Sequence, residues 1–423
     1  MLNLTFSRHF LRMAAAPCVM ALWAMAAPAV QTADWPQWRG ADRKDHAYEG
    51  NLLKEWPKEG PKRLWLSREG GLGYAGFAVV RGKLFTSGLK DQTEHMLAFD
   101  AESGKALWSA PLGSRYPNKW GDGPRGTPTV AGDYVYALGG QGKLVCAKVS
   151  DGTVVWSKEM KELGGGVPGW GYCESVLVDG DQVICTPGGS QGALAALNAK
   201  TGEVLWRSKD FTDGAQYASI VPFEFGGKRQ YVQLTMQNIV GVNAADGKVL
   251  WKSGFPGRVA VIPTPIYHDG HVYVAAGYGV GCKMIKLGND LSVTDVYENK
   301  VMKNHHGGVI QIGDHLYGHS DGPGWVCQDF KSGAEVWASK ALGKGAVSAA
   351  DGMLYCVEEG SGTVVLAVAS PKAWEEKGRF KLDPQTTQRS PDGRIWTHPV
   401  ISNGKLYLRD QELIYCYDIR ASR

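Results

Sequence analysis

The sequence predicts an all-β fold: an eight-bladed β-propeller of four-stranded antiparallel blades, closed by an N-terminal strand. Three observations carry this prediction. A motif that ends in tryptophan recurs at intervals of roughly 40–50 residues, the period of a propeller blade. Asp-Gly and Asn-Gly turns join short alternating segments between its copies. The 56 glycines and 20 prolines indicate many turns and few helices.

The repeated motif is a small residue, a spacer, Asp or Asn, a short turn that ends in glycine, three further residues and tryptophan. We expect the Asp or Asn side chain to accept hydrogen bonds from the turn amides, and the glycine to supply a left-handed residue. The flat tryptophan suits the wedge between neighbouring sheets. The copies span residues 98–108, 146–156, 196–206, 241–251 and 327–337, and the second is weaker because Lys148 replaces the acidic residue.

A hairpin signal precedes each copy. Asp179-Gly180, Asp269-Gly270 and Asn403-Gly404 each stand between alternating apolar segments. Such pairs favour tight hairpins because both turn residues need positive φ. One blade therefore has four strands: the two strands of the hairpin, a strand with the small residue and the Asp, and a strand with the tryptophan.

Eight such upstream halves begin near Tyr74, Arg125, Cys173, Tyr217, Ile262, His306, Ala346 and Thr397. The last half lacks a tryptophan strand because the chain ends soon after Asp418, whereas an unmatched tryptophan strand stands at 63–65. We predict that this N-terminal strand completes the eighth blade, which leaves no open sheet edge. Tyr297 and the stretch near Phe380 stand where tryptophan is expected in blades five and seven, so seven blades is the alternative.

The first 29 residues are typical of an export signal, because Arg8 and Arg12 precede an apolar run that ends in small residues. We predict cleavage near Ala29, a periplasmic or secreted protein, and one propeller domain over residues 30–423. An uncleaved anchor is the alternative. We expect a monomer with no transmembrane segment in the mature chain. The formal net charge of +4 includes two signal arginines, so the mature chain is nearly neutral, which argues against a nucleic-acid partner.

The cysteines are predicted to be buried fillers. Cys146, Cys327 and Cys416 occupy the small-residue position of the motif, where other copies have Ala or Gly. Equivalent positions of different blades lie far apart, so we expect few or no disulfides although the chain is exported.

The motif resembles the tryptophan-docking repeat of the pyrroloquinoline-quinone (PQQ) propeller superfamily, and the resemblance extends from about Trp35 to the end of the chain. Residues 34–40, Asp-Trp-Pro-Gln-Trp-Arg-Gly, resemble the mature start of its BamB-like branch. That superfamily contains quinoprotein dehydrogenases, which bind PQQ and calcium in the propeller funnel, and BamB-like periplasmic scaffolds without enzymatic activity. The repeat alone therefore does not decide the function.

We favour a non-catalytic binding scaffold whose partner is a protein or a small anionic or sugar-like ligand. The alternative is a PQQ-dependent alcohol or sugar dehydrogenase, which implies PQQ and calcium in the funnel. Many such dehydrogenases are longer and carry two adjacent cysteines, and this sequence has no Cys-Cys pair. A lyase or hydrolase is a third option. We assign no catalytic residue and no cofactor, and enzymatic activity stays open.

The loops before the inner strands of a propeller open onto one face, and here they carry functional groups that would converge on one concave site. Arginine and lysine suit carboxylates, while tyrosine and tryptophan offer stacking faces. Trp120 and Trp170 on these loops are candidates for partner contact or for blade caps. The alternative is that these side chains line a hydrated channel or pack between blades. The candidate ligand-binding residues are Tyr74, Arg125, Tyr172, Glu174, Tyr217, Arg258, His305, His306, Lys344, Trp396 and His398.

We predict no metal site. His305 and His306 are adjacent, and neighbours on a strand face opposite sides. No Cys or carboxylate motif with metal spacing accompanies them. Glu174 is the only carboxylate that the pattern places near the funnel, whereas calcium takes six or more oxygen ligands.

Overall fold

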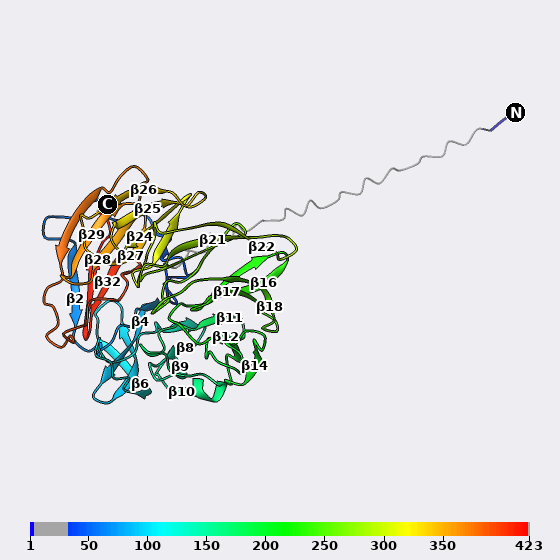
Figure 1. The fold of residues 1–423 in the computed structure, drawn as a ribbon, viewed down its shortest axis with the longest axis horizontal. Helices are drawn as coiled ribbons and strands as arrows, with labels where there is room; N and C mark the ends of the chain where they lie inside the picture. Colours follow the sequence, from blue (N-terminus) through cyan, green and yellow to red (C-terminus); the bar gives the residue numbers. More distant parts are fainter. Residues whose placement is uncertain (4–32, 422–423) are drawn as a thin grey trace. The chain divides into compact units, whose positions relative to one another are not determined.

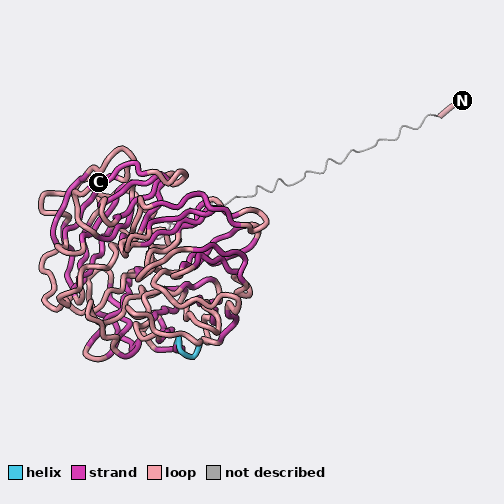
Figure 2. Tube along the Cα trace, viewed as in Figure 1, coloured by secondary structure: helices cyan, strands magenta, loops and turns pink. Residues whose placement is uncertain are grey.

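The computed structural model describes residues 1–3 and 33–421, so the predicted export signal lies almost wholly outside the described residues. Within residues 33–421, eight sheets surround a common axis, and one short 3-10 helix, η1 (Met160–Leu163), interrupts the strands (Figures 1 and 2). No helix in this part of the chain combines the length and apolar character needed to cross a membrane.

The first four blades follow one another along the chain, each with its first strand innermost. Their strands are β3 (Ala78–Val80), β4 (Lys83–Lys90), β5 (Thr93–Asp100) and β6 (Ala106–Ser114) in blade one; β7 (Thr129–Ala131), β8 (Tyr134–Leu138), β9 (Lys143–Lys148) and β10 (Val154–Glu159) in blade two; β11 (Leu177–Asp179), β12 (Gln182–Cys185), β13 (Ala195–Asn198) and β14 (Val204–Arg207) in blade three; and β15 (Val221–Phe225), β16 (Lys228–Leu234), β17 (Asn238–Asn243) and β18 (Val249–Gly254) in blade four.

The last four blades keep this order, but the N-terminal part of the chain adds a strand to two of them. Their strands are β19 (Ile266–His268), β20 (His271–Ala276), β21 (Gly281–Leu287) and β22 (Val293–Asn299) in blade five; β23 (Val309–Ile312), β24 (His315–Ser320), β25 (Gly324–Asp329) and β26 (Glu335–Ser339) in blade six; β27 (Gly345–Ala350), β28 (Met353–Glu358), β29 (Thr363–Val368), β30 (Glu376–Lys381) and the added β1 (His46–Ala47) in blade seven; and β31 (Val400–Ser402), β32 (Lys405–Asp410), β33 (Leu413–Asp418) and the added β2 (Lys62–Ser67) in blade eight. The predicted all-β, eight-bladed fold is confirmed.

The motif tryptophan joins most blades to the next one, whereas Trp251 of blade four donates to Gln230 Oε1 of its own blade at 2.8 Å. Trp108 Nε1 donates at 3.2 Å to the carbonyl of Val149, the first residue after Lys148 in the motif turn of blade two. Its ring lies against Gly152, where a Cβ would come within 2.6 Å of the ring and where φ is 76°. This glycine is therefore required both by the turn and by the ring. The same type of bond to the next blade is made by Trp65, Trp156, Trp206 and Trp337, and by the hydroxyl of Tyr297 in blade five.

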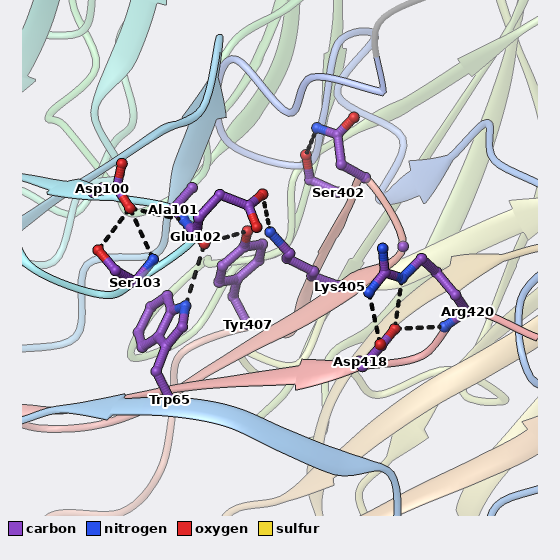
Figure 3. Close-up of polar contacts among 12 residues, drawn as sticks. Trp65, Asp100, Ala101, Glu102, Ser103, Ser402, Lys405, Tyr407, Asp418 and Arg420 are labelled. Carbon is purple, nitrogen blue, oxygen red and sulfur yellow. Dashed lines mark hydrogen bonds and ion pairs between the residues drawn. The ribbon is translucent and has the colours of Figure 1, made fainter.

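The ring closes as predicted. Strand β2 pairs antiparallel with β33, and Trp65 Nε1 donates to the carbonyl of Ala101 in blade one at 3.2 Å (Figure 3). Lys405 forms an ion pair with Glu102 across the same junction (Figure 3). The buried Arg409 on β32 donates to carbonyls of Ala75 and Ser87 at 2.8 and 2.9 Å. Blade eight is thus held to blade one by side chains as well as by the borrowed strand.

Blade seven obtains its tryptophan from outside the repeat. Gly378 occupies the motif position, opposite Leu366 in the ladder. Trp56 covers this glycine, because a Cβ on Gly378 would stand 2.7 Å from Trp56 Cβ. The Trp56 ring lies 6.1 Å from the Tyr355 ring, which matches the 6.0 Å between Trp65 and Tyr407 in blade eight. The missing tryptophan is therefore replaced in space, and the blade count is eight.

The sequence did not predict the path of residues 34–47, here named the axial segment, which crosses the central channel. It contacts every blade through the following pairs: Trp35 with Val79, Pro36 with Val130, Arg43 with Val176 and Ile220, Trp38 with Thr264, Arg39 with Val309, and Asp45 with Ala349 and His398. Arg39, Arg43 and Asp45 have φ of 63°, 60° and 60°, a conformation that L residues rarely adopt. The bonds of these side chains to the inner strands hold the segment in that conformation.

The cysteines lie where the motif placed them. Cys146, Cys327 and Cys416 face Trp156, Trp337 and Trp65 across their ladders. All seven cysteines of the described residues are unpaired thiols.

Candidate functional site

A cavity of about 590 Å³ lies on the face where the loops before the inner strands meet, with Trp38 and Arg39 of the axial segment at its base. A second hollow of about 530 Å³ is lined by Arg39 and residues 41–44. Arg39 of the axial segment therefore borders both hollows. The first one brings together eight of the predicted residues: Tyr74, Arg125, Tyr217, His305, His306, Lys344, Trp396 and His398.

Three predicted residues do not line this cavity. Tyr172 and Glu174 are buried, while their neighbours Cys173 and Ser175 face the funnel. Side chains alternate between two sides in an extended chain, so the prediction chose the residues whose side chains point away from the funnel. Arg258 is exposed, and the adjacent Val259 lines the cavity instead.

Glu174 belongs to the interior of blade three. Its carboxylate accepts hydrogen bonds from Thr186 N at 2.7 Å and from Thr186 Oγ1 at 2.9 Å. Burial raises the pKa of Glu174 to about 7, although these bonds and the charge of Arg43 favour the ionised form.

Aromatic side chains form much of the wall. The Trp396 ring lies 4.9 Å from Tyr74, 5.8 Å from His306 and 6.5 Å from Trp120. Trp170 packs edge-on to Tyr217 at 5.7 Å. The two loop tryptophans, Trp120 and Trp170, therefore belong to the cavity wall.

Arg125 is held by its own loop. Its guanidinium donates to the carbonyls of Gly123 at 2.6 Å and Gly121 at 2.8 Å. It also lies over the rings of Tyr74 and Tyr116, at 5.5 and 5.2 Å. This arginine fixes the Trp120 loop against the wall, so its guanidinium is not free to bind a ligand carboxylate.

Glu359, which the sequence analysis missed, is central to the wall. It accepts a hydrogen bond from Trp396 Nε1 at 2.9 Å, and its Oε2 lies 3.0 Å from His306 Nε2. Burial lowers the pKa of His306, which favours the neutral ring. Glu359 directly follows β28, and Tyr278 and Asp321 stand near the end of the second strand in blades five and six. The turn after the second strand of a blade opens on the same face as the loop before its first strand. A search of the residues that follow each second strand would therefore have found these three residues as candidates for the site.

A second polar group joins blades six and seven. Lys344 Nζ is hydrogen-bonded to His305 Nδ1, and His305 Nε2 lies 3.7 Å from Asp321 Oδ2. Burial and the charge of Lys344 lower the pKa of His305 to about 4, so its ring is neutral at neutral pH. His305 and His306 lie in the loop before β23 rather than on a strand. The expectation that they face opposite sides was wrong, because both rings line the cavity.

His398 connects the axial segment to blade eight at the base of the cavity. Its Nδ1 lies 3.1 Å from Asp45 Oδ2, and its Nε2 lies 2.8 Å from the carbonyl of His306. Both partners are acceptors, so the ring satisfies both only when each nitrogen carries a proton.

The donor set does not fit a calcium-bound quinone. Calcium takes six or more oxygen ligands. In the described part of the chain, no three His, Cys, Asp or Glu side chains are grouped to hold an ion. The carboxylate of Glu359 is already engaged by Trp396 and His306, and Glu174 lies behind the wall.

A sequence profile of the family described as outer membrane protein assembly factor BamB matches residues 92–339, more than half of the chain. The chain belongs to this BamB family. Among curated relatives, the BamB protein of Kangiella koreensis is 26% identical over 196 residues, which cover 44% of each chain. Tetrathionate hydrolase of Acidithiobacillus ferrooxidans is 23% identical over 247 residues, which cover 50% of this chain and 45% of the relative. The matches thus span less than half the length of these relatives.

Solved structures show the same fold. BamB from Moraxella catarrhalis superposes with a TM-score of 0.59 at 13% identity, covering 86% of this chain and 98% of that one. Quinohemoprotein alcohol dehydrogenase from Comamonas testosteroni gives a TM-score of 0.63 at 12% identity, covering 92% and 81%. BamB family members and enzymes therefore share this architecture, so the function has to be argued from the residues of the site.

Proposed function

We propose that the chain is an exported, non-catalytic binding protein whose funnel takes a small ring-shaped ligand of sugar-like or aromatic character. The cavity itself carries the proposal, because about 590 Å³ is enclosed by an aromatic wall above the axial segment. Pockets of this size and lining bury most of the surface of a small ligand. Arg125, Lys344 and Glu359 contact their own neighbours, which supports a preformed binding surface.

Export to the periplasm is part of this proposal and rests on the first 29 residues. A protein partner is the second candidate, because the family is described as an assembly factor and Trp120 and Trp170 are only partly buried. A partner loop with an aromatic tip would use the same wall.

The test is the binding of a fluorescent ring probe, methylumbelliferyl β-glucoside, followed by fluorescence anisotropy. Trp396→Ala removes the ring at the centre of the wall, and we expect about tenfold weaker binding because an aromatic contact contributes about 1 kcal/mol beyond its buried area. Tyr48→Ala is the control, since Tyr48 is exposed and lies outside the cavity lining.

Two results contradict the proposal. One is the absence of binding up to millimolar probe, and the other is equal affinity of wild type and Trp396→Ala. Titration with PQQ, with and without calcium, tests the dehydrogenase alternative. Calcium-dependent binding of PQQ, together with oxidation of an alcohol or sugar, would replace the binding function with an enzymatic one.

A further inference from the structure

The base of the cavity contains a buried donor without an acceptor. The side chain of Arg39 is 1% exposed. Its Nη2 donates to the carbonyl of Val309 at 2.6 Å, and its Nε lies 3.4 Å from Asp45 Oδ2. Its Nη1 has no hydrogen-bond partner among the described residues. Buried polar groups are nearly always paired, because an unpaired one loses its hydration without compensation.

Charged groups surround this donor. Arg39 and His398 both lie beside the carboxylate of Asp45. Burial lowers the pKa of Arg39, mainly through loss of hydration, whereas Asp45 and Asp42 support its charge. A ligand carboxylate would give this guanidinium the acceptor that its Nη1 lacks.

Gly308 stands beside the unpaired donor of Arg39. A Cβ on Gly308 would stand 2.8 Å from His398 Cε1 and 3.5 Å from Arg39 Nη1. Gly308 also lines the cavity and has φ of 79°. Any larger residue here would crowd His398 and the unpaired donor of Arg39.

We propose that the base of the funnel is an anion subsite, in which Arg39 Nη1 binds a singly charged carboxylate of the ligand. The inference rests on the proposed function and specifies its ligand class: a ring-shaped acid, such as a sugar acid, with its ring against the aromatic wall and its carboxylate on Arg39. An arginine donor suits a carboxylate because a charge-assisted bond is stronger than a neutral one.

The experiment compares two probes that differ only in this group, methylumbelliferyl β-glucuronide and methylumbelliferyl β-glucoside, by fluorescence anisotropy with the full mature chain. We expect the glucuronide to bind at least about tenfold more tightly, the effect of one charge-assisted hydrogen bond. Arg39→Lys keeps the charge but removes Nη1, so it should weaken the glucuronide about tenfold and the glucoside less than about twofold.

Arg258→Ala is the matched control, because this arginine is exposed and outside the cavity lining. It should leave both affinities unchanged. If Arg39→Lys does not fold, acetate supplies a test on the wild type, because it should displace the glucuronide and not the glucoside. Binding of the glucoside with no preference for the glucuronide overturns the subsite and leaves the proposed function intact. Failure of both probes overturns the proposed function.

Discussion

Glu174 shows how one buried group couples this fold to pH. Its pKa rises to about 7, so the folded chain holds this proton more tightly than the unfolded chain does. Between pH about 4.5 and about 7, its contribution to stability therefore falls as pH rises. His305, His306 and His319 act in the opposite direction, because burial lowers their pKa values and the folded chain carries fewer protons.

Glu174→Gln isolates this carboxyl from the histidines. The amide has nearly the same shape as the protonated acid but does not ionise. We expect the free energy of unfolding of the variant, minus that of the wild type, to rise by about 2–3 kcal/mol between pH 5 and pH 8. Urea denaturation of both proteins at pH 5, 6.5 and 8 measures this difference. A difference that stays constant over this range contradicts the raised pKa.

At the scale of elements, the N-terminal segment replaces parts that the repeat lacks. Strand β2 completes blade eight, and Trp56 covers Gly378 in blade seven. Trp56 is 5% exposed and packs edge-on against Phe380 at 5.3 Å. Trp56 thus belongs to the core of blade seven, although residue 56 lies outside the repeated motif of that blade.

We predict that Trp56→Ala lowers the free energy of unfolding by about 3–5 kcal/mol, the usual cost of a large aromatic cavity. Tyr48→Ala, in the same segment but 63% exposed, should change it by less than about 1 kcal/mol. Chemical denaturation followed by circular dichroism measures both variants. Equal effects of the two substitutions would show that Trp56 does not serve as the tryptophan of blade seven.

At the scale of the whole molecule, blade eight differs from the other seven. The four repeat strands of each other blade are consecutive in the chain, whereas blade eight pairs β2 from the N-terminal part with β33 from the C-terminal part. This ladder can separate without breaking the order of the other strands, so weakening it should permit partial opening before global unfolding.

Trp65→Ala and Trp206→Ala make the same chemical change in the closing ladder of blade eight and in a blade of four consecutive strands. We expect both to lower the denaturation midpoint, and only Trp65→Ala to lower the m-value as well, because an opened ring breaks two-state behaviour. Urea denaturation followed by tryptophan fluorescence and by circular dichroism gives both quantities. Identical m-values in the two variants contradict preferential opening at the closure.

Much of the fold was predictable because each repeat contains the turn and strand residues that form its own blade. Asp100 accepts hydrogen bonds from Ser103 N at 2.8 Å and Ser103 Oγ at 2.7 Å, as the motif implied (Figure 3). The site was predicted only in part. Eight of the eleven predicted residues line the cavity. Tyr172 and Glu174 point away from it, and the residues in the turns after the second strands, such as Glu359, were not predicted.

The sequence by itself determined the blade and the closing strand and favoured eight blades over seven, because turn chemistry and strand alternation act between residues close in the chain. Only the tertiary structure decided where the axial segment lies and which groups meet at its surface. Arg39, Asp45 and His398 come from segments separated by more than 350 residues and meet only when the ring closes around the axial segment. No local pattern records such a contact, since its stability depends on burial that the complete propeller creates.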